Sequence, residues 1–238
     1  MFHLKTLSTV MILSIETSTD VCSVAISNEG HTINSLVYDQ ESAHASHLTP
    51  MIQDLMQKSC LEFRDLDAVA VSCGPGSYTG LRIGASTAKG IAYAAGIKLI
   101  AVPTLSIIAH AIFRQFPDVR VACPMIDARR MEVYSAIISR DGQILRTTEA
   151  VVVDDGSFGT ELAHMDITFG GNGAPKCSKV ISSPNAHFVD GIRPLASDMD
   201  QLAYDRLLAG RTESIAYFEP FYLKDFVATV PKNKVLAN

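Results

Sequence analysis

Apolar and polar residues alternate in three short runs near the N-terminus, at residues 11–16, 22–27 and 32–38. Such alternation predicts β-strands, because successive side chains of a strand point to opposite faces of its sheet. Turn-forming residues at 18–20 and 28–30 separate the runs. The chain is therefore predicted to begin with a meander of three strands.

A helical pattern comes next, between residues 41 and 60, although Pro50 either kinks this helix or marks its first turn. The apolar positions at helical spacing are Leu48, Met51, Ile52, Leu55 and Met56. The apolar run 68–71 predicts a buried strand, which a helix rich in Gly and Ala and a strand at 99–102 follow. Two strands that flank a helix predict a parallel crossover unit.

The second half of the chain repeats this opening. After a helical stripe at 105–113, strands are predicted at 121–126 and 133–138, with a turn at Asp141-Gly142 before a further extended run. A short helix at 158–163 and a strand at 167–169 follow. Ser197 is predicted to cap a helix that runs to Leu208, and residues 217–225 form an extended tail. The pattern indicates a duplicated architecture without repeated sequence.

Small residues recur every four positions in the helix that follows Gly74-Pro75-Gly76, at Gly80, Gly84, Ala88 and Ala92. Ser77 or Thr79 is expected to cap its first turn. Glycine destabilises a helix interior by up to ~1 kcal/mol relative to alanine, so the ridge needs a compensating contact. Three interpretations remain open: packing on the protein's own sheet, pairing with a helix of a partner, and anion binding at the helix start.

Composition narrows the class of protein. With 238 residues, 47% of them hydrophobic, the chain can bury a large core in one or two domains. A net charge of -5 argues against a broad basic surface that grips nucleic acid. Five scattered cysteines without a CxxC pair are typical of reduced thiols, so we expect a cytoplasmic protein. No apolar run is long enough for a membrane span. Met11 is a candidate natural start, in which case residues 1–10 would be an upstream extension.

The candidate chemistry is sparse. His44 and His47 share a helical face, but no third ligand stands at a companion spacing, so we expect no metal site and no catalytic residue. Three turns have the form of nucleotide-binding turns, and each alone is ordinary. They contain Glu16, Thr17 and Ser18, then Asp127, and then Gly171 and Gly173.

Four motifs together carry a family resemblance: MILSIETSTDVCSVAIS from Met11, CGPGSYTGLRIGASTAKGIAYA from Cys73, DARRMEVY from Asp127 and EPFYLKDF from Glu219. The chain closely resembles the bacterial TsaB (YeaZ) proteins over nearly its whole length. The resemblance implies an α/β fold of the actin, Hsp70 and sugar-kinase (ASKHA) superfamily. Two domains, residues 1–103 and 104–238, would each hold a mixed sheet with flanking helices, and the helix at 197–209 would pack back on the first.

The resemblance also implies a function. Proteins of this family help to form N6-threonylcarbamoyladenosine at position 37 of tRNAs that read ANN codons. The chain would be a non-catalytic subunit that activates its paralogue TsaD, with TsaE as a further partner and tRNA reached through the complex. It would form a homodimer when alone. No cofactor is expected to bind it independently, although ATP or ADP could bind at the interface of the complex.

The family's pairing surface is a helical bundle. Carried onto this sequence, the expected interface comprises His47, Leu48, Met51, Leu55, Gly80, Leu81, Gly84, Ala88 and Ala92. TsaD-like proteins bind a metal through HxxxH, and Thr104 and Ile108 stand where those histidines would be. Glu16 replaces the Asp usual at the first phosphate turn, so we expect a closed or vestigial cleft.

Two enzymatic alternatives stay open from sequence. One is a stand-alone ATP-dependent transferase or kinase that acts from a cleft between the halves. The other is a glycoprotease-like metallopeptidase, which would need a metal or a nucleophile that the sequence does not supply.

Overall fold

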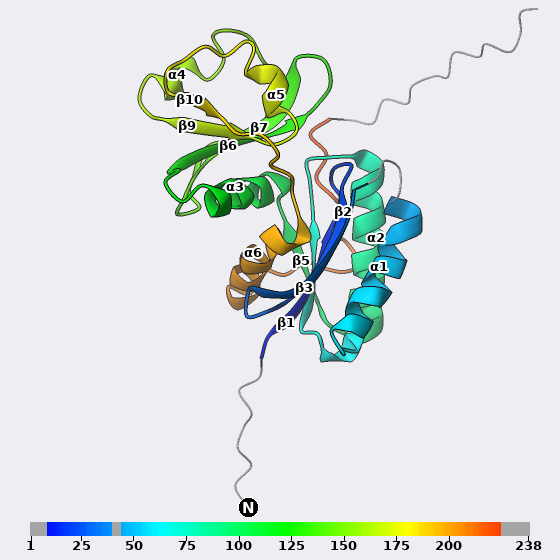
Figure 1. Cartoon of the computed structure of the whole chain (residues 1–238). Helices are drawn as coiled ribbons and strands as arrows, with labels where there is room; N and C mark the ends of the chain where they lie inside the picture. Colours follow the sequence, from blue (N-terminus) through cyan, green and yellow to red (C-terminus); the bar gives the residue numbers. More distant parts are fainter. Residues whose placement is uncertain (1–8, 40–43, 225–238) are drawn as a thin grey trace, which may run out of the picture.

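The computed structural model describes residues 9–39 and 44–224. Its elements form two mixed sheets, each flanked by helices on both faces (Figure 1). The first sheet contains β1 (Met11–Glu16), β2 (Cys22–Asn28), β3 (His31–Tyr38), β4 (Ala68–Ser72) and β5 (Lys98–Val102). The second contains β6 (Val121–Asp127), β7 (Glu132–Ser139), β8 (Ile144–Val152), β9 (Ile167–Gly170) and β10 (Ala186–Phe188).

The two sheets have the same topology. The first has the order β3-β2-β1-β4-β5, and the second has β8-β7-β6-β9-β10. In each sheet the first three strands along the chain are antiparallel neighbours, and the last two pair in parallel. The predicted duplication is therefore confirmed at the level of strand order.

The helices are α1 (His44–Lys58), α2 (Tyr78–Ala95), α3 (Thr104–Gln115), α4 (Gly159–Leu162), α5 (Ala174–Cys177) and α6 (Ala196–Leu208), with a 3-10 turn η1 (Phe63–Asp65). α1 and α2 cover one face of the first sheet, and α6 packs against the other face. α3 covers the second sheet from the side of α6, and α4 and α5 cover its far face. α3 and α6 thus lie between the two sheets (Figure 1).

Strand alternation explains how one sheet serves two helical layers. Leu13 and Ile15 of β1 face α1 and α2, whereas Ile12 packs with Met199 of α6. Ser14 shares the α6 face, where its hydroxyl donates to Asp200 Oδ1 at 2.7 Å. Both faces of the sheet are buried, so its central strands carry apolar residues on both sides.

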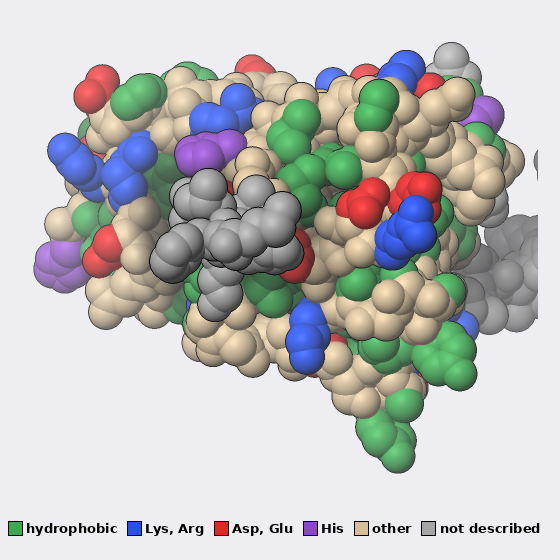
Figure 2. All heavy atoms as spheres, turned by 90° about the horizontal axis from the view of Figure 1, so that it is seen from below, with side chains coloured by type: hydrophobic (Ala, Val, Ile, Leu, Met, Phe, Trp, Pro, Cys, Tyr) green, Lys and Arg blue, Asp and Glu red, His purple; other side chains and the backbone are tan. Residues whose placement is uncertain are grey.

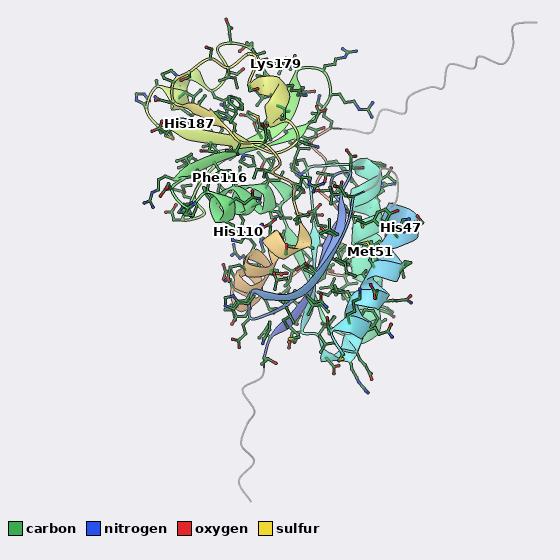
Figure 3. The ribbon with its side chains drawn as sticks, in the orientation of Figure 1. His47, Met51, His110, Phe116, Lys179 and His187 are labelled. Carbon is green, nitrogen blue, oxygen red and sulfur yellow. The ribbon has the colours of Figure 1, made fainter. Side chains whose placement is uncertain are left out.

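α3 and α6 also join the two halves through polar contacts. Arg114 of α3 forms an ion pair with the buried Asp198 of α6 at 2.8 Å, and His110 Nδ1 lies 2.7 Å from the Asp198 carbonyl oxygen. Figure 3 labels His110 on the side of α3 that faces α6. The prediction that Ser197 caps α6 is wrong, because the N-cap position belongs to Leu195, which forms no side-chain cap. The proposed division at residue 103 remains a prediction.

After α6 the chain continues as an irregular segment with a turn at residues 215–217; we call residues 213–224 the strap. It begins beside β5, where Glu213 N donates to the Leu99 carbonyl at 2.8 Å. Lys89 of α2 then donates to the Phe218 carbonyl at 3.0 Å, and Phe221 N donates to the Cys73 carbonyl at 2.7 Å. At its described end Lys224 pairs with Glu132 of β7. The strap therefore links the first half back to the second.

Candidate functional site

The N-terminal side of the candidate site is the junction of β1 with the start of α2. Ser77 is the N-cap of α2, as expected, and its hydroxyl accepts from Gly80 N at 3.2 Å. The Ser77 N–H in turn donates to the Ser18 carbonyl at 2.7 Å, and Thr17 Oγ1 donates to the Gly80 carbonyl at 2.8 Å. The turn after β1 is thus bound directly to the first turn of the helix.

Glu16 lies beneath this turn and is fully buried. Its Oε1 accepts from Ser18 N at 2.5 Å. Burial raises the pKa of Glu16 to about 7, against the opposing effect of hydrogen bonds with Ser18 and Ser72. A carboxyl that is hard to ionise and does not reach solvent is poorly suited to hold a metal ion or to contact a phosphate.

The C-terminal side is the turn at residues 127–132, which we call the arginine turn. Asp127 N donates to Asn172 Oδ1 at 2.9 Å, and Arg129 N donates to Asp127 Oδ1 at 2.9 Å. Lys176 forms an ion pair with Asp127 and donates to the carbonyls of Arg130 and Glu132 at 2.8 and 2.6 Å. One ammonium group therefore holds three points of the turn.

The glycines after β9 allow this loop to pack beneath the arginine turn. Gly171 has a φ of +109°, and a β-carbon there would overlap the Met125 carbonyl. A β-carbon on Gly173 would lie 3.0 Å from the Ile126 carbonyl carbon. The expected nucleotide-like turns at Asp127 and at Gly171 to Gly173 are thus neighbours in space.

A cleft of about 660 Å³ separates the two sides. The first half contributes residues 18–20 and the start of α2, and the second contributes Asp127, Arg129, Tyr134 and Asn172. Residues 221–224 of the strap also line it. The structure therefore brings Ser18 and Asp127 to one cleft, while Glu16 and Thr17 lie buried beneath its wall.

The residues of the cleft fit a magnesium–nucleotide poorly. A metal-bound nucleotide needs a free carboxylate, and the Asp127 carboxylate already pairs with Lys176 and accepts from Arg129 N. In addition, the Tyr222 ring of the strap packs against Tyr78 at the start of α2, with centroids 4.9 Å apart. The cleft thus lacks a free carboxylate at Asp127 and has an aromatic pair in its lining.

The helix pair is the second candidate site, and most of the residues expected to contact a partner lie inside the chain's own fold. Of the nine residues assigned to the interface, seven are buried within the chain's own fold, namely Leu48, Leu55, Gly80, Leu81, Gly84, Ala88 and Ala92. A β-carbon on Gly80 would overlap the Thr17 carbonyl, and one on Gly84 would overlap the Thr17 hydroxyl. The small residues therefore let α2 approach the β1–α2 junction of its own chain, which gives the ridge a packing reason inside the fold.

The opposite face of α2 is exposed. Arg82, Ser86, Gly90 and Tyr93 form a stripe at helical spacing, and Tyr93 is 81% exposed. On the neighbouring α1, His47 and Met51 are partly exposed one turn apart (Figure 3), and the His47 ring stacks on Tyr38. Viewed from below, hydrophobic side chains protrude on the side where α1 and α2 lie (Figure 2). A helical surface is thus available, made of other residues than the ridge.

No grouping of three His, Cys, Asp or Glu side chains within the described residues could hold a metal ion. Thr104 and Ile108 are both buried at the start and middle of α3. The side chain of His44 lies outside the described residues. The described helices include none that is both long and apolar enough to cross a membrane.

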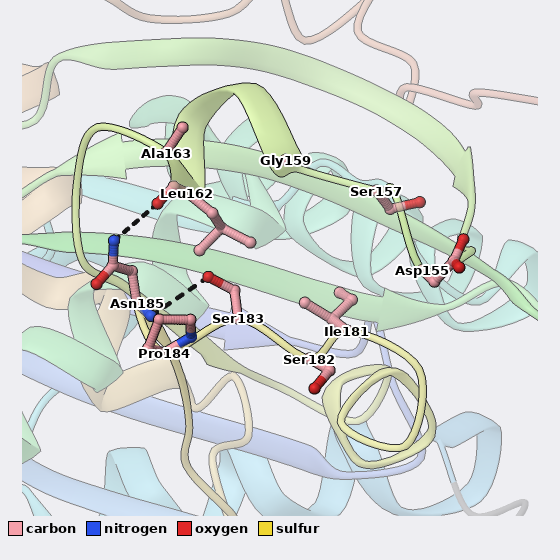
Figure 4. A pocket seen from close by; sticks show the side chains of 10 residues that line it. All are labelled: Asp155, Ser157, Gly159, Leu162, Ala163, Ile181, Ser182, Ser183, Pro184 and Asn185. Atoms are coloured by element: carbon pink, nitrogen blue, oxygen red, sulfur yellow. Dashed lines mark hydrogen bonds between the residues drawn. The ribbon is translucent and has the colours of Figure 1, made fainter.

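A second hollow of about 330 Å³ lies in the C-terminal half (Figure 4). It is lined by Leu162, Ile181 and neighbouring small polar residues, and Asn185 Nδ2 donates to the Leu162 carbonyl at 2.8 Å. None of the residues expected from sequence to be functional lies in it.

Sequence reasoning missed the groups that matter most in the cleft. Lys176 is 49 positions from Asp127, and nothing in its local pattern announces the contact. Tyr222 and Lys224 belong to the EPFYLKDF motif, which on the sequence alone carries only a family resemblance. That motif could have indicated a structured role for the strap.

Comparisons with known proteins agree with one another. Residues 35–232 match the family described as TsaD: tRNA N6-adenosine threonylcarbamoyltransferase. The chain is 34% identical to the tRNA threonylcarbamoyladenosine biosynthesis protein TsaB of Escherichia coli (strain K12), an alignment that covers 91% of this chain and 96% of that protein.

Solved structures support the same relationship. The chain superposes with a TM-score of 0.81 on a Pseudomonas aeruginosa protein described as similar to the peptidase YEAZ, at 27% identity over 90% of this chain and 100% of the other. The activator of 2-hydroxyisocaproyl-CoA dehydratase from Clostridium difficile shares the fold alone, with a TM-score of 0.51 and 10% identity over 85% of this chain and 97% of that one.

Proposed function

The chain belongs to the TsaB (YeaZ) family of tRNA threonylcarbamoyladenosine biosynthesis proteins and has the two-domain α/β fold of the ASKHA superfamily, and from this premise we propose that it is a non-catalytic subunit that activates TsaD. It takes part in forming N6-threonylcarbamoyladenosine at position 37 of tRNAs that read ANN codons. The assembly works in the cytoplasm, and TsaE is a further partner. The chain reaches tRNA through this complex.

The observation that carries the non-catalytic role is the ion pair between Lys176 and Asp127. In a nucleotide-dependent enzyme of this fold, the carboxylate at this turn would face a metal ion. Here an ammonium group neutralises it from within the protein. Glu16 is buried beneath the wall of the cleft, so neither Glu16 nor Asp127 offers a free carboxylate to a metal ion.

The surface proposed to bind TsaD is the exposed side of α1 and α2. It offers the exposed aromatic side chain of Tyr93 on α2 and the partly exposed side chain of Met51 on the adjacent α1. Aromatic and methionine side chains are enriched at protein interfaces, where they supply a large apolar contact area. The same surface forms a homodimer when the chain is alone. ATP or ADP binds only at the junction with TsaD.

The experiment is reconstitution of tRNA modification from purified components. TsaD with its carbamoyl donor and tRNA should modify adenosine at a low rate, and the wild-type chain should raise that rate. A Tyr93→Asp variant should fold normally, because its side chain is 81% exposed, and should bind TsaD more weakly by about tenfold or more. Ile144→Asp on β8, also exposed, serves as the matched control. Equal stimulation by the wild type and Tyr93→Asp would show that the surface is misassigned.

The stand-alone transferase remains a second candidate because the cleft is large, at about 660 Å³. It predicts that the isolated chain binds magnesium–ATP and loses this binding in Asp127→Asn. A calorimetric titration of the wild-type chain with no heat of binding would exclude it. Modification of tRNA by the isolated chain would overturn the non-catalytic role.

A further inference from the structure

The arginine turn has two consecutive non-glycine residues in the left-handed region of backbone space. Arg129 has a φ of 71° and Arg130 a φ of 47°. An L-residue in this region is strained, and such strain persists only where the surrounding structure enforces it. Both side chains are exposed. The fold therefore holds two guanidinium groups at a surface position where glycine would fit with less strain.

The turn is rigid as well as strained. Ala128 N donates to the Glu132 carbonyl at 3.0 Å, and Glu132 N donates to the Arg129 carbonyl at 3.0 Å. Lys176 holds the turn from below through Asp127 and two carbonyls. Exposed arginine side chains lose conformational freedom on binding, but a backbone that is already fixed adds no ordering cost of its own.

The local charges leave both arginines available. Asp127 pairs with Lys176, and Glu132 pairs with Lys224, so the carboxylates of the turn are each neutralised by a lysine. Within the described residues, neither Arg129 nor Arg130 forms an ion pair with a carboxylate. The turn and its two lysines thus carry four cations against two anions. Among the described residues, two further acids lie near the turn. Asp20 is on the opposite wall of the cleft, and Asp154 follows Val153, whose N–H donates to the Met131 carbonyl.

The position of the turn relates it to the proposed partner surface. Arg129 lines the same cleft as Tyr78 and Thr79 at the start of α2. In Figure 1 the part of the second half that contains α5 lies above α2 of the first half. The arginine turn therefore lies beside the N-terminal end of α2, one of the two helices proposed to bind TsaD.

From these observations, and resting on the proposed function, we infer that Arg129 and Arg130 bind the phosphate backbone of the tRNA in the complex with TsaD. Guanidinium groups bind phosphate in a bidentate geometry, and unpaired cations release counterions when they contact RNA. Contacts to phosphate position a nucleic acid without reading its sequence, so they leave recognition of the modified adenosine to TsaD. A small basic turn is also compatible with the overall charge of -5.

The test measures tRNA binding by the complex of TsaD with this chain, as wild type and as the double variant Arg129→Gln/Arg130→Gln, over a series of salt concentrations. The double variant should bind tRNA about tenfold more weakly at low salt. Its plot of log affinity against log salt should be shallower by about 1 to 2. Its affinity for TsaD should match that of the wild type. Arg64→Gln, on the distant η1 turn, is the control and should change neither quantity.

Four outcomes separate the sources of a failure. If the double variant binds tRNA with unchanged affinity and salt slope, the inference is overturned. If it instead weakens the complex with TsaD, the arginines bind an acidic protein surface, and the RNA assignment is wrong. If the free chain binds ATP through these arginines in a titration, the ligand is a nucleotide and the inference again fails. Failure of the wild-type chain to stimulate TsaD would count against the proposed function alone.

Discussion

The hydroxyl of Thr17 lies where a β-carbon on Gly84 would be. Thr17 follows β1 and Gly84 is in the second turn of α2, and the glycine allows the helix to approach this closely. Any side chain at residue 84 must displace Thr17, whose hydroxyl also donates to the Gly80 carbonyl. The recurrence of small residues in α2 is therefore explained by contact inside the chain.

Gly84→Ala should destabilise the protein. The added methyl group forces the helix away from β1, and overpacking of this kind costs about 1–3 kcal/mol of unfolding free energy. Gly90→Ala is the matched control in the same helix, since nothing lies within 4 Å of the place its β-carbon would take and alanine favours the helix by up to ~1 kcal/mol. Urea denaturation should show a lower free energy of unfolding for Gly84→Ala and a higher one for Gly90→Ala. Equal shifts would mean that Thr17 moves away from the added methyl group at little cost in free energy.

The stability of the protein should fall as pH rises towards neutrality. The pKa of Glu16 is raised from 4.5 to about 7 and that of Asp200 from 3.8 to about 6, in both cases chiefly by burial. A carboxyl whose pKa is higher in the folded state than in the unfolded state favours folding while it is protonated. Its contribution to the free energy of unfolding is complete below the unfolded-state pKa and is lost as the pH rises through the folded-state pKa. Between pH 6 and 7 Glu16 should supply most of the slope, about 1 kcal/mol.

Glu16→Gln should flatten that part of the curve. The amide cannot ionise, so the free energy of unfolding of the variant should be nearly constant from pH 6 to 7, while the Asp200-dependent decline below pH 6 remains. Thermal unfolding at fixed ionic strength measures both. A wild-type curve that rises with pH in this window would refute the assignment to Glu16.

Lys176→Met should loosen the arginine turn. The substitution removes the ion pair with Asp127 and two hydrogen bonds to carbonyls, while methionine keeps much of the packing of the side chain. A double-mutant cycle with Asp127→Asn should give a coupling of about 1 kcal/mol. Lys179→Met, exposed three residues later, is the control and should have no measurable effect. Additive effects of the first two substitutions would contradict a direct contact.

Arg130→Gly should stabilise the fold while it removes a cation. Glycine adopts a φ of 47° without steric strain, so the free energy of unfolding should rise by up to about 1 kcal/mol. Arg64→Gly, within the η1 turn, should lower it instead. Denaturant titrations of the two variants and the wild type measure these changes in the free energy of unfolding. A less stable Arg130→Gly would show that the arginine side chain itself supports the turn.

Much of the fold could be predicted from local pattern. The alternation at β1, β2 and β3, the stripe of α3 and the turn at Gly142, which has a φ of 85°, all appear where the residues indicate. The short strand β10 was missed, because three residues carry too little periodicity. Pro50 lies inside α1, a placement that the sequence left open.

The candidate site could be predicted only in part. Turn chemistry identified Ser18, Asp127 and the glycines on either side of Asn172, and the cleft brings Ser18, Asp127 and Asn172 together. The spacing of Gly80 and Gly84 predicted close contact but could not say with what, because a small residue suits its own sheet as well as a partner. Lys176 and the strap act across long separations in sequence, which no local pattern encodes.

The return of α6 to the first sheet has a consequence for synthesis on the ribosome. Ile12 and Ile100 belong to a surface that stays open to water until Met199 and Ala203 have left the exit tunnel. By then the whole second half has been translated, so the earliest-made strands wait longest for their cover. Chaperones that recognise nascent apolar segments would find their target on that face, and a message truncated before codon 196 would yield a chain that cannot complete its first half.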